Sequence, residues 1–253
     1  MNLEKKCIYG IHSVKSILSM DLTNASLYCI ESHQSHTIKK IIKIAKAKSV
    51  VIYSISKSFF NEILNKYFPN EKIVHQNIFL LCNTERKLHK ESYLNTLQCN
   101  NQTFILILDS LQDQRNFGAC IRTADAVDIS CIVYSKNRSP DVESGIVSKA
   151  SSGAIERVPL VSVSNLHRTI KNLKSKGVWI LGLSIESNTS FFSLNLKSPV
   201  AIVMGSEGSG LRPIIRKECD YLASLPMTGN VSSLNVSVAA AVAMYEVVRQ
   251  RLV

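Results

Sequence analysis

FILILD, residues 104–109, is the first of four nearly continuous apolar runs in this chain of 253 residues. The other three runs are ISCIVYS (129–135), VWILGLS (178–184) and PVAIVMG (199–205). Short apolar runs that end in small or acidic residues are typical of strands buried on both faces of a parallel sheet. Helical patterns alternate with them, over residues 117–127, 142–154, 165–176, 210–218 and 233–252. This alternation predicts an open α/β domain whose functional residues lie at the carboxyl ends of the strands.

The first third of the chain predicts a second, smaller α/β unit. SLYCIE (26–31), SVVIYSI (49–55) and NIFLLC (77–82) are rich in the β-branched and aromatic residues that favour strands. Residues 36–48 place isoleucines on one helical face and lysines on the other, and residues 57–68 predict a second helix. Residues 83–102 are polar and have no clear periodicity. We therefore predict an N-terminal domain over 1–82, a linker over 83–102 and a second domain over 103–253.

The distribution of charge favours a polyanionic partner. The chain has a formal net charge of +11. Residues 1–97 carry 14 basic and 7 acidic side chains, a net of +7, whereas residues 98–253 carry 16 and 12, a net of +4. The smaller segment thus holds most of the excess, which favours nucleic-acid contact by that segment over simple solvation of its surface.

The sequence gives no sign of membrane insertion, secretion or metal binding. No apolar run approaches the length of a membrane span. The first residues lack a continuous hydrophobic segment and a cleavage site, so we expect a cytoplasmic protein, with organellar import left open. The seven cysteines never form C-x-x-C pairs, which argues against a zinc site and a disulfide framework. Cys29, Cys82, Cys120 and Cys131 are expected to be small buried apolar residues.

Three polar clusters follow predicted strands. The first, DSLQDQRNFGACIRTADA (109–126), contains Asn116 and Arg122, which taken alone indicate a turn residue and a surface residue. The second, GSEGSGL (205–211), has three glycines that permit close backbone approach to a ligand, and Glu207 is its one charged residue. Neither a Walker A lysine nor a dinucleotide-binding glycine pattern is present.

The third cluster, LPMTGNVSSLNVSVAAAVAMYEVV (225–248), joins a strand end to a long helix. Ser232 and Ser233 fit the helix N-cap, the role in which serine is common. The alanines that follow suggest a helix packed closely against the sheet or against another subunit. Asn235 is predicted to lie on the second turn of the helix, in a crowded region. A polar side chain there is expected to have a hydrogen-bonding or functional role.

The three clusters together resemble one family. N-x-G-x(3)-R-T-A at 116–124, M-G-x-E-x-x-G-L at 204–211 and P-M-x-G-x-V-S-S-L-N-V-S-V-A at 226–239 resemble, in order and spacing, the motifs of the SpoU/TrmH RNA ribose 2′-O-methyltransferases. IYGIHSV (8–14) resembles the opening of the RlmB-type branch, which methylates a guanosine of 23S rRNA. The chain has His75-Gln76-Asn77 where that branch usually has His-Gln-Gly.

The resemblance implies a fold, a cofactor and partners. The second domain is expected to be a trefoil-knotted α/β domain of the SPOUT superfamily. The first is expected to be a ribosomal-protein L30e-like RNA-binding domain. S-adenosyl-L-methionine (AdoMet) would be held largely by backbone groups at Gly205, Leu225 and Leu234, without a metal. The expected partners are 23S rRNA or a large-subunit precursor and a second copy of the chain, whose residues complete the active site.

The resemblance also implies residue roles. The family's proposed base matches Arg122. A guanidinium stays protonated, however, so stabilising negative charge on the ribose oxygen or binding a phosphate is the more ordinary role. Asn116 and Glu207 are expected to position this arginine and the substrate, and Ser233 and Asn235 to order the turn around cofactor and ribose. Two alternatives remain open: the same chemistry on tRNA or another rRNA site, and a non-catalytic RNA-binding assembly factor.

Overall fold

The computed structural model describes residues 5–20, 22–32, 35–69, 73–83 and 88–252. The chain divides into two compact units, one of residues 1–86 and 152–156 and the other of residues 87–151 and 157–253. Each unit has its own sheet and its own hydrophobic core. The α/β class predicted for both parts of the chain is confirmed.

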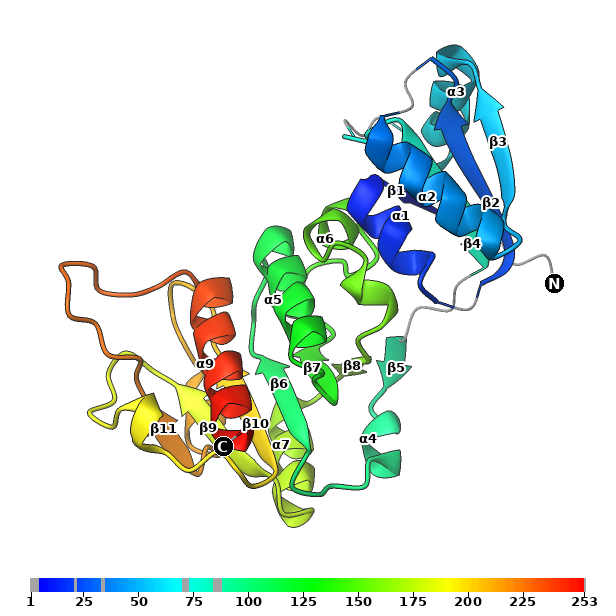
Figure 1. Ribbon diagram of the computed structural model, residues 1–253. Helices are drawn as coiled ribbons and strands as arrows, with labels where there is room; N and C mark the ends of the chain where they lie inside the picture. The colour runs from blue at the N-terminus through cyan, green and yellow to red at the C-terminus, as the bar shows by residue number, and fades with distance from the viewer. Residues whose placement is uncertain (1–4, 21, 33–34, 70–72, 84–87, 253) are drawn as a thin grey trace. The chain divides into compact units, whose positions relative to one another are not determined.

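A four-stranded sheet forms the centre of the first unit (Figure 1). Its order is β1 (Lys6–Tyr9), β4 (Ile78–Asn83), β2 (Thr23–Ile30) and β3 (Val51–Ile55). Strands β2 and β3 are parallel, and β4 runs antiparallel to both β1 and β2. Helices α1 (Ile11–Ile17) and α2 (His36–Ala47) pack on one face of the sheet, and α3 (Lys57–Tyr67) packs on the other.

Helix α2 forms where the alternating isoleucine and lysine pattern predicts it. The Ser35 side chain caps the helix by accepting a hydrogen bond from the Ile38 amide. Ile38, Ile41 and Ala45 are buried against the sheet. The lysines on the other side of the helix are exposed, namely Lys39, Lys40, Lys43 and Lys46. This face is therefore free to contact solvent or a polyanion.

The His75-Gln76-Asn77 segment has a left-handed backbone at two positions. Gln76 and Asn77 have φ values of 53° and 61°, in the left-handed region. Glycine enters this region at no steric cost, and asparagine is among the side-chain-bearing residues that tolerate it best. The Asn77 amide also donates to His75 Nδ1 over 3.0 Å. Asparagine is therefore compatible with the left-handed backbone at position 77, where the resemblance implies glycine.

Seven parallel strands form the sheet of the second unit. Their order across the sheet is β11 (Tyr221–Ala223), β9 (Trp179–Leu183), β10 (Val200–Met204), β6 (Phe104–Leu108), β7 (Cys131–Ser135), β8 (Leu160–Val163) and β5 (Leu88–Lys90). Strand β6 lies between β7 and β10, so the strand order reverses there. Ligands of open α/β sheets bind at the carboxyl ends of strands flanking such a reversal.

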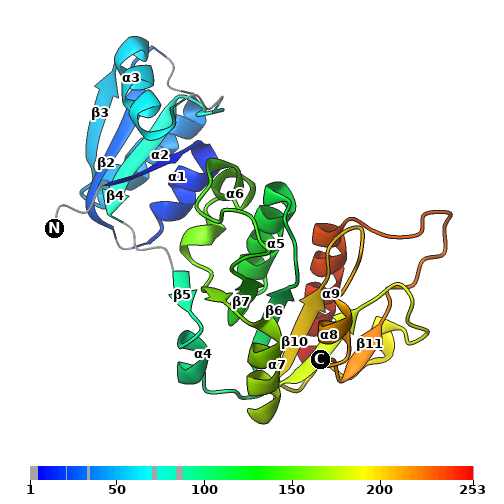
Figure 2. The ribbon, with the colours of Figure 1, turned by 180° about the vertical axis from the view of Figure 1, so that it is seen from behind.

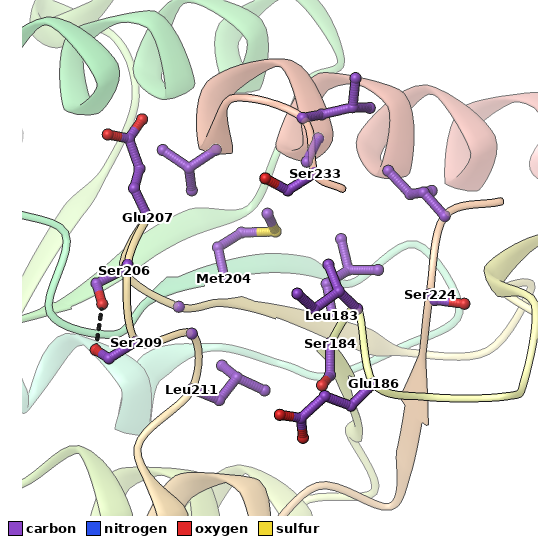
Figure 3. A pocket seen from close by; sticks show the side chains of 18 of the residues that line it. Leu183, Ser184, Glu186, Met204, Ser206, Glu207, Ser209, Leu211, Ser224 and Ser233 are labelled. Atoms are coloured by element: carbon purple, nitrogen blue, oxygen red, sulfur yellow. Dashed lines mark hydrogen bonds between the residues drawn. The ribbon is translucent and has the colours of Figure 1, made fainter. Parts of the chain in front are cut away.

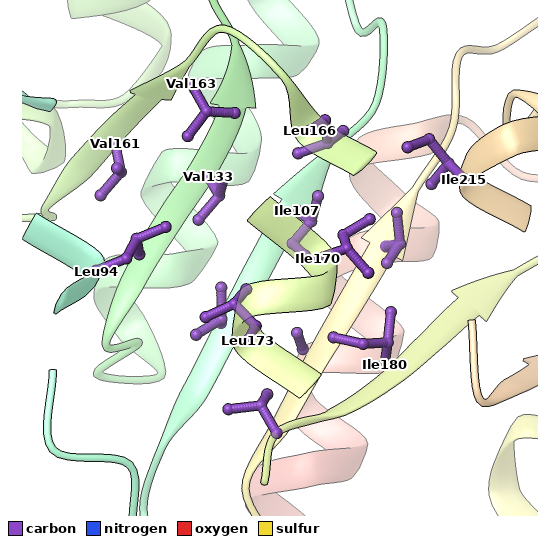
Figure 4. Packing of buried hydrophobic residues seen from close by; sticks show 14 of the residues in the cluster. Leu94, Ile107, Val133, Val161, Val163, Leu166, Ile170, Leu173, Ile180 and Ile215 are labelled. Carbon is purple, nitrogen blue, oxygen red and sulfur yellow. The ribbon is translucent and has the colours of Figure 1, made fainter. Parts of the chain in front are cut away.

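Helices cover both faces of this sheet (Figures 1 and 2). On one face α7 (Leu166–Ser175) places Leu166, Ile170 and Leu173 against alternate strand residues (Figure 4). On the other face α5 (Gln114–Ala126) packs against α9 (Val236–Arg251), and α9 contacts β10. Every residue of β6, β7 and β10 is buried, as the continuous apolar runs predicted.

The predicted linker differs from the structure over its described part. Residues 88–96 form β5 and α4 (Tyr93–Thr96), and β5 pairs with β8 at the edge of the large sheet. Leu94 is fully buried in the core of the second unit. A three-residue strand and a one-turn helix are too short to show periodicity, which is why the sequence suggests a linker. Residues 84–87 of that segment lie outside the described residues.

Several predicted helices are shorter than their patterns. The 142–154 pattern holds α6 (Gly145–Ala150) and then a 3-10 turn, and the 210–218 pattern holds only α8 (Pro213–Arg216).

Cys29, Cys82, Cys120 and Cys131 are buried, as expected. Within the described ranges no helix combines the length and apolarity needed to cross a membrane. The chain threading that the resemblance implies, a trefoil knot, stays a prediction.

Candidate active site

The glycine-rich loop after β10 is closed on itself. The Ser206 amide donates to the Gly210 carbonyl over 3.1 Å, and the Gly210 amide donates back to the Ser206 carbonyl over 3.0 Å. The Ser206 and Ser209 hydroxyls are 2.7 Å apart. A Cβ atom on Gly205 would lie 2.1 Å from the carbonyl carbon of Gly210. Only glycine therefore fits at position 205, where the missing side chain lets the start of the loop lie against its end.

Asp109 holds both ends of this loop from the end of β6. Its amide donates to the carbonyl of Met204, which precedes the loop, over 2.8 Å. Its carboxylate accepts from the amide of Arg212, which follows the loop, over 3.0 Å and from Arg212 Nε over 2.6 Å. The Asp109 side chain is fully buried. Sequence reasoning missed this pair, because the two residues are 103 positions apart.

We expect Asp109→Asn to destabilise the protein and weaken cofactor binding, because an amide group would face the Arg212 donors. Removing one partner of a buried ion pair costs about 3 kcal/mol in the free energy of unfolding. Denaturant unfolding measures this loss. Arg168→Gln is the matched control, since Arg168 forms an exposed pair with Glu91 and its loss costs less than about 1 kcal/mol. Equal losses in the two variants would show that Asp109 does not hold the loop.

A pocket opens at the carboxyl ends of β9, β10 and β11 (Figure 3). Five residues predicted from the sequence line it, namely Gly205, Glu207, Leu225, Ser233 and Leu234. The side chains of Leu183, Met204 and Leu211 form its apolar interior. The pocket also includes residues that sequence reasoning did not select, namely Ser184, Ile185, Glu186, Arg216, Ser224, Met227, Val236 and Ala239. They come from the segments after β9 and β11, from α8 and from the start of α9, which become adjacent only in the fold.

An ion pair crosses the pocket lining on the side away from Glu207. Arg216 Nη1 donates to Glu186 Oε2, and both residues line the pocket. Figure 3 shows Glu186 and Glu207 on different sides of the cavity. The pocket therefore joins an apolar interior to charged groups at two places. Such a lining suits a cofactor with one apolar or aromatic part and several polar groups.

Asn116, Glu207 and Asn235 come together beside the pocket. Glu207 Oε1 accepts a hydrogen bond from Asn116 Nδ2 over 2.7 Å and one from Asn235 Nδ2 over 2.8 Å. Asn235 Nδ2 also donates to Asn116 Oδ1 over 3.0 Å. The three residues belong to three different motifs and lie up to 119 positions apart. Each amide group is fixed in one orientation by this network.

Asn235 is the N-cap of α9, which corrects the predicted roles of the serines. Its Oδ1 accepts from the amides of Ser237 and Val238, and from the Ser237 hydroxyl over 2.6 Å. The helix starts at Val236, so Ser232 and Ser233 precede it and do not cap it. Serine and asparagine both favour the cap position, so composition alone could not select between them. Asn235 therefore joins the start of α9 to the polar cluster.

Arg122 lies apart from this cluster within one chain. It is exposed on α5, six residues after Asn116. Six residues of α-helix turn the side chain by about 240° and advance it by about 9 Å. Among the described residues, no hydrogen bond or ion pair engages the Arg122 side chain. The role of Asn116 and Glu207 in positioning this arginine stays a prediction.

Two further residues of the first motif have structural roles. A Cβ atom on Gly118 would lie 2.5 Å from the Ala150 side chain, so the glycine permits α5 to pack closely on α6. Burial raises the pKa of the Cys120 thiol to about 12. This thiol is therefore uncharged at neutral pH and is a packing group rather than a nucleophile.

No group of three His, Cys, Asp or Glu side chains in the described part of the chain could hold a metal ion.

Comparisons with known families agree with both units. Residues 103–245 match the model of the SpoU rRNA Methylase family, and residues 7–88 match that of the RNA 2′-O ribose methyltransferase substrate-binding family. The chain is 38% identical over 248 residues to the 23S rRNA (guanosine-2′-O-)-methyltransferase RlmB of Coxiella burnetii, which covers 97% of this chain and 96% of the relative. It is 34% identical to RlmB of Escherichia coli, over 96% of this chain and 98% of the relative.

Solved structures share the fold. The SpoU methyltransferase AviRb from Streptomyces viridochromogenes, in complex with AdoMet, superposes with a TM-score of 0.74 at 18% identity. The match covers 98% of this chain and 91% of AviRb. A further RNA 2′-O ribose methyltransferase superposes with a TM-score of 0.77 at 22% identity, over 99% of this chain and 90% of its own.

Proposed function

The chain belongs to the SpoU rRNA methylase family, and on that premise we propose that it transfers the methyl group of AdoMet to the ribose 2′-hydroxyl of a guanosine in 23S rRNA. The observation that carries this proposal is the convergence of Asn116, Glu207 and Asn235 beside a pocket lined by Gly205, Leu225 and Leu234. The relatives that are named for this reaction cover nearly the whole chain.

The pocket fits AdoMet. Gly205 lies directly against the backbone of Gly210 and Leu211, where any Cβ atom would clash, so the loop folds tightly at the edge of the pocket. Gly205, Leu225 and Leu234 would hold the cofactor through their backbone groups, over the apolar interior formed by Leu183, Met204 and Leu211. AdoMet supplies an electrophilic methyl group at its sulfonium centre. The chain must therefore place the ribose oxygen in line with that group and stabilise the negative charge that develops on it.

Arg122 supplies this charge stabilisation in our proposal, from a second copy of the chain. The residue is exposed on α5, six residues after Asn116, so its side chain leaves the helix in a different direction. Helix α9 beside α5 presents Val238, Val242 and Tyr245 to solvent at a spacing of one helical face. An exposed apolar stripe of this kind fits a homodimer interface. Dimerisation would bring the Arg122 of one chain to the polar cluster of the other.

The first unit is the RNA-recognition element in our proposal, because residues 7–88 match the RNA 2′-O ribose methyltransferase substrate-binding family. We expect a fragment of residues 88–253 to bind AdoMet as the full chain does but to bind 23S rRNA about 10²-fold more weakly, since one of two linked binding modules is lost. Calorimetry with AdoMet and filter binding with RNA measure the two affinities. Undiminished RNA affinity would contradict the assignment. The fragment must include Leu94, which is fully buried in its core.

Two other functions make different predictions. Methylation of tRNA or of another rRNA site uses the same polar cluster, and the full-length match to 23S rRNA enzymes favours the large-subunit substrate. A non-catalytic assembly factor would not need the hydrogen-bonded cluster or the glycine loop. Such a protein would show no AdoMet binding by calorimetry.

The proposed function is tested by mapping ribose methylation across total RNA from cells with and without the gene. We expect one guanosine of 23S rRNA to lose its 2′-O-methyl group in the deleted strain. Loss of a 2′-O-methyl group from tRNA instead would identify tRNA as the substrate. An unchanged map would reject the methyltransferase activity. A 23S rRNA substrate also implies that the protein works in the cytoplasm.

A further inference from the structure

A row of four aromatic residues crosses the sheet of the first unit. The strand register pairs Tyr9 with Phe79, Phe79 with Tyr28, and Tyr28 with Tyr53. The Tyr28 ring lies 4.7 Å from Phe79 at an interplanar angle of 11°, and 4.9 Å from Tyr53 at 20°. The row is on the face that α3 covers, since Phe60 of α3 lies 4.7 Å from Phe79. Three of the four rings therefore form one continuous stack.

The stack ends at an exposed ring. Strand β3 is the outer strand of the sheet (Figure 1), and Tyr53 is 44% exposed, whereas Phe79 is fully buried under α3. Tyr28 is the one described aromatic ring that stacks on Tyr53. The packing on one side of Tyr53 holds its ring in place before any partner arrives. Binding to a ring that is already ordered avoids the entropic cost of fixing it.

We propose that Tyr53 is a stacking platform for an unpaired base of the RNA substrate. This inference rests on the proposed function and adds the surface that grips the RNA. Every base has a π-face, so stacking on a tyrosine suits single-stranded segments of any sequence. The first unit carries 12 basic and 7 acidic side chains over residues 1–86 and 152–156, a net of +5, which favours a polyanion over a protein as the occupant. Residues 7–88 also match the substrate-binding family.

The Tyr53 platform differs physically from the lysine face of α2. Lys39, Lys40 and Lys43 are exposed on a helix that packs on the opposite face of the sheet. Contacts of lysines with phosphates release counterions, so each contact adds to the salt dependence of binding. A base that stacks on an uncharged ring releases no counterion at that contact, so it adds nothing to the salt dependence. Loss of the platform should therefore weaken RNA binding without changing the salt dependence.

The test compares Tyr53→Ala, Tyr53→Phe and Phe59→Ala in the full-length protein. The probe is unmodified 23S rRNA transcribed in vitro, and the dissociation constant is measured by filter binding at several salt concentrations. Phe59 is the matched control, since it is 48% exposed in the same unit and stacks on no described ring. We expect Tyr53→Ala to bind about 5- to 150-fold more weakly, the range measured for one stacked base. Tyr53→Phe and Phe59→Ala should bind as the parent does.

Each further outcome has a defined meaning. The slope of log affinity against log salt should be the same in Tyr53→Ala as in the parent, whereas Lys39→Gln with Lys40→Gln and Lys43→Gln should flatten it. Unchanged affinity in Tyr53→Ala, an equal loss in Phe59→Ala, or a flattened slope in Tyr53→Ala would overturn the proposal. Normal binding of Tyr53→Ala to naked RNA but weak binding to a precursor particle would assign the ring to a protein partner. Absence of methyl transfer by the parent protein would reject the proposed function. The measured RNA affinities would still show whether Tyr53 contacts RNA.

Discussion

Arg122→Ala is expected to lower methyl transfer by about 10²–10³-fold, the usual cost of removing one donor that stabilises developing charge. Its AdoMet affinity and its stability should stay close to those of the parent, because Arg122 is exposed and makes no contact with the pocket in its own chain. Single-turnover transfer of labelled methyl groups measures the effect. Arg168→Ala, another exposed arginine of the same unit, is the control and should keep full activity. If the variant keeps half of the parent turnover, Arg122 does not stabilise the transition state.

Mixed dimers test the origin of this arginine. If Arg122 of one chain serves the polar cluster of the other, a dimer of one Arg122→Ala chain and one Asn235→Asp chain contains one intact site. Random mixing of these two weak variants should then restore about a quarter of the parent activity, since half of the dimers are mixed and each has one of two sites intact. No recovery would mean that both residues act within one chain.

Asn235→Asp is expected to lower turnover by about 100-fold, the effect of a misplacement of about 1 Å in an active site. The carboxylate still accepts from the Ser237 and Val238 amides, so the cap of α9 is kept. It loses the two N–H bonds to Asn116 and Glu207 and places a second negative charge beside Glu207. Steady-state kinetics and thermal unfolding separate the two effects, because activity should fall while the melting temperature changes little.

The control for this change is Asn165→Asp. Asn165 is also a helix N-cap whose side chain accepts a backbone amide, at the start of α7, and it takes no part in the polar cluster. The same substitution there should leave the activity unchanged. Equal activity losses in the two variants would show that the Asn235 donors have no special role. A large drop in melting temperature for Asn235→Asp would instead point to a purely structural cause.

The buried strands could be predicted from the sequence because both faces of a parallel sheet require apolar residues. Residues 104–108, 131–135 and 200–204 show this directly. Strands β5, β8 and β11 have only three or four residues each and carry too little pattern to be recognised. Their places depend on pairing with strands that are distant in the sequence. Local pattern therefore predicts the centre of the sheet and misses part of its edges.

The site shows a similar division. The motifs supplied Asn116, Glu207 and Asn235, and the structure joins them through hydrogen bonds. Asp109, Glu186 and the partners Arg212 and Arg216 were not selected, since a lone charged residue after a strand has many possible roles. The separation of Arg122 from the cluster follows from helix geometry, which a linear motif does not show.

Transfer of methyl groups in vitro tests the central claim most directly. The purified protein is incubated with AdoMet labelled in its methyl group and, separately, with unmodified 23S rRNA and unmodified tRNA transcripts. The RNA is then digested to nucleosides. We predict label in 2′-O-methylguanosine from 23S rRNA and none from tRNA. Label on a base, label in tRNA alone, or no label with protein that binds both AdoMet and RNA would contradict the account.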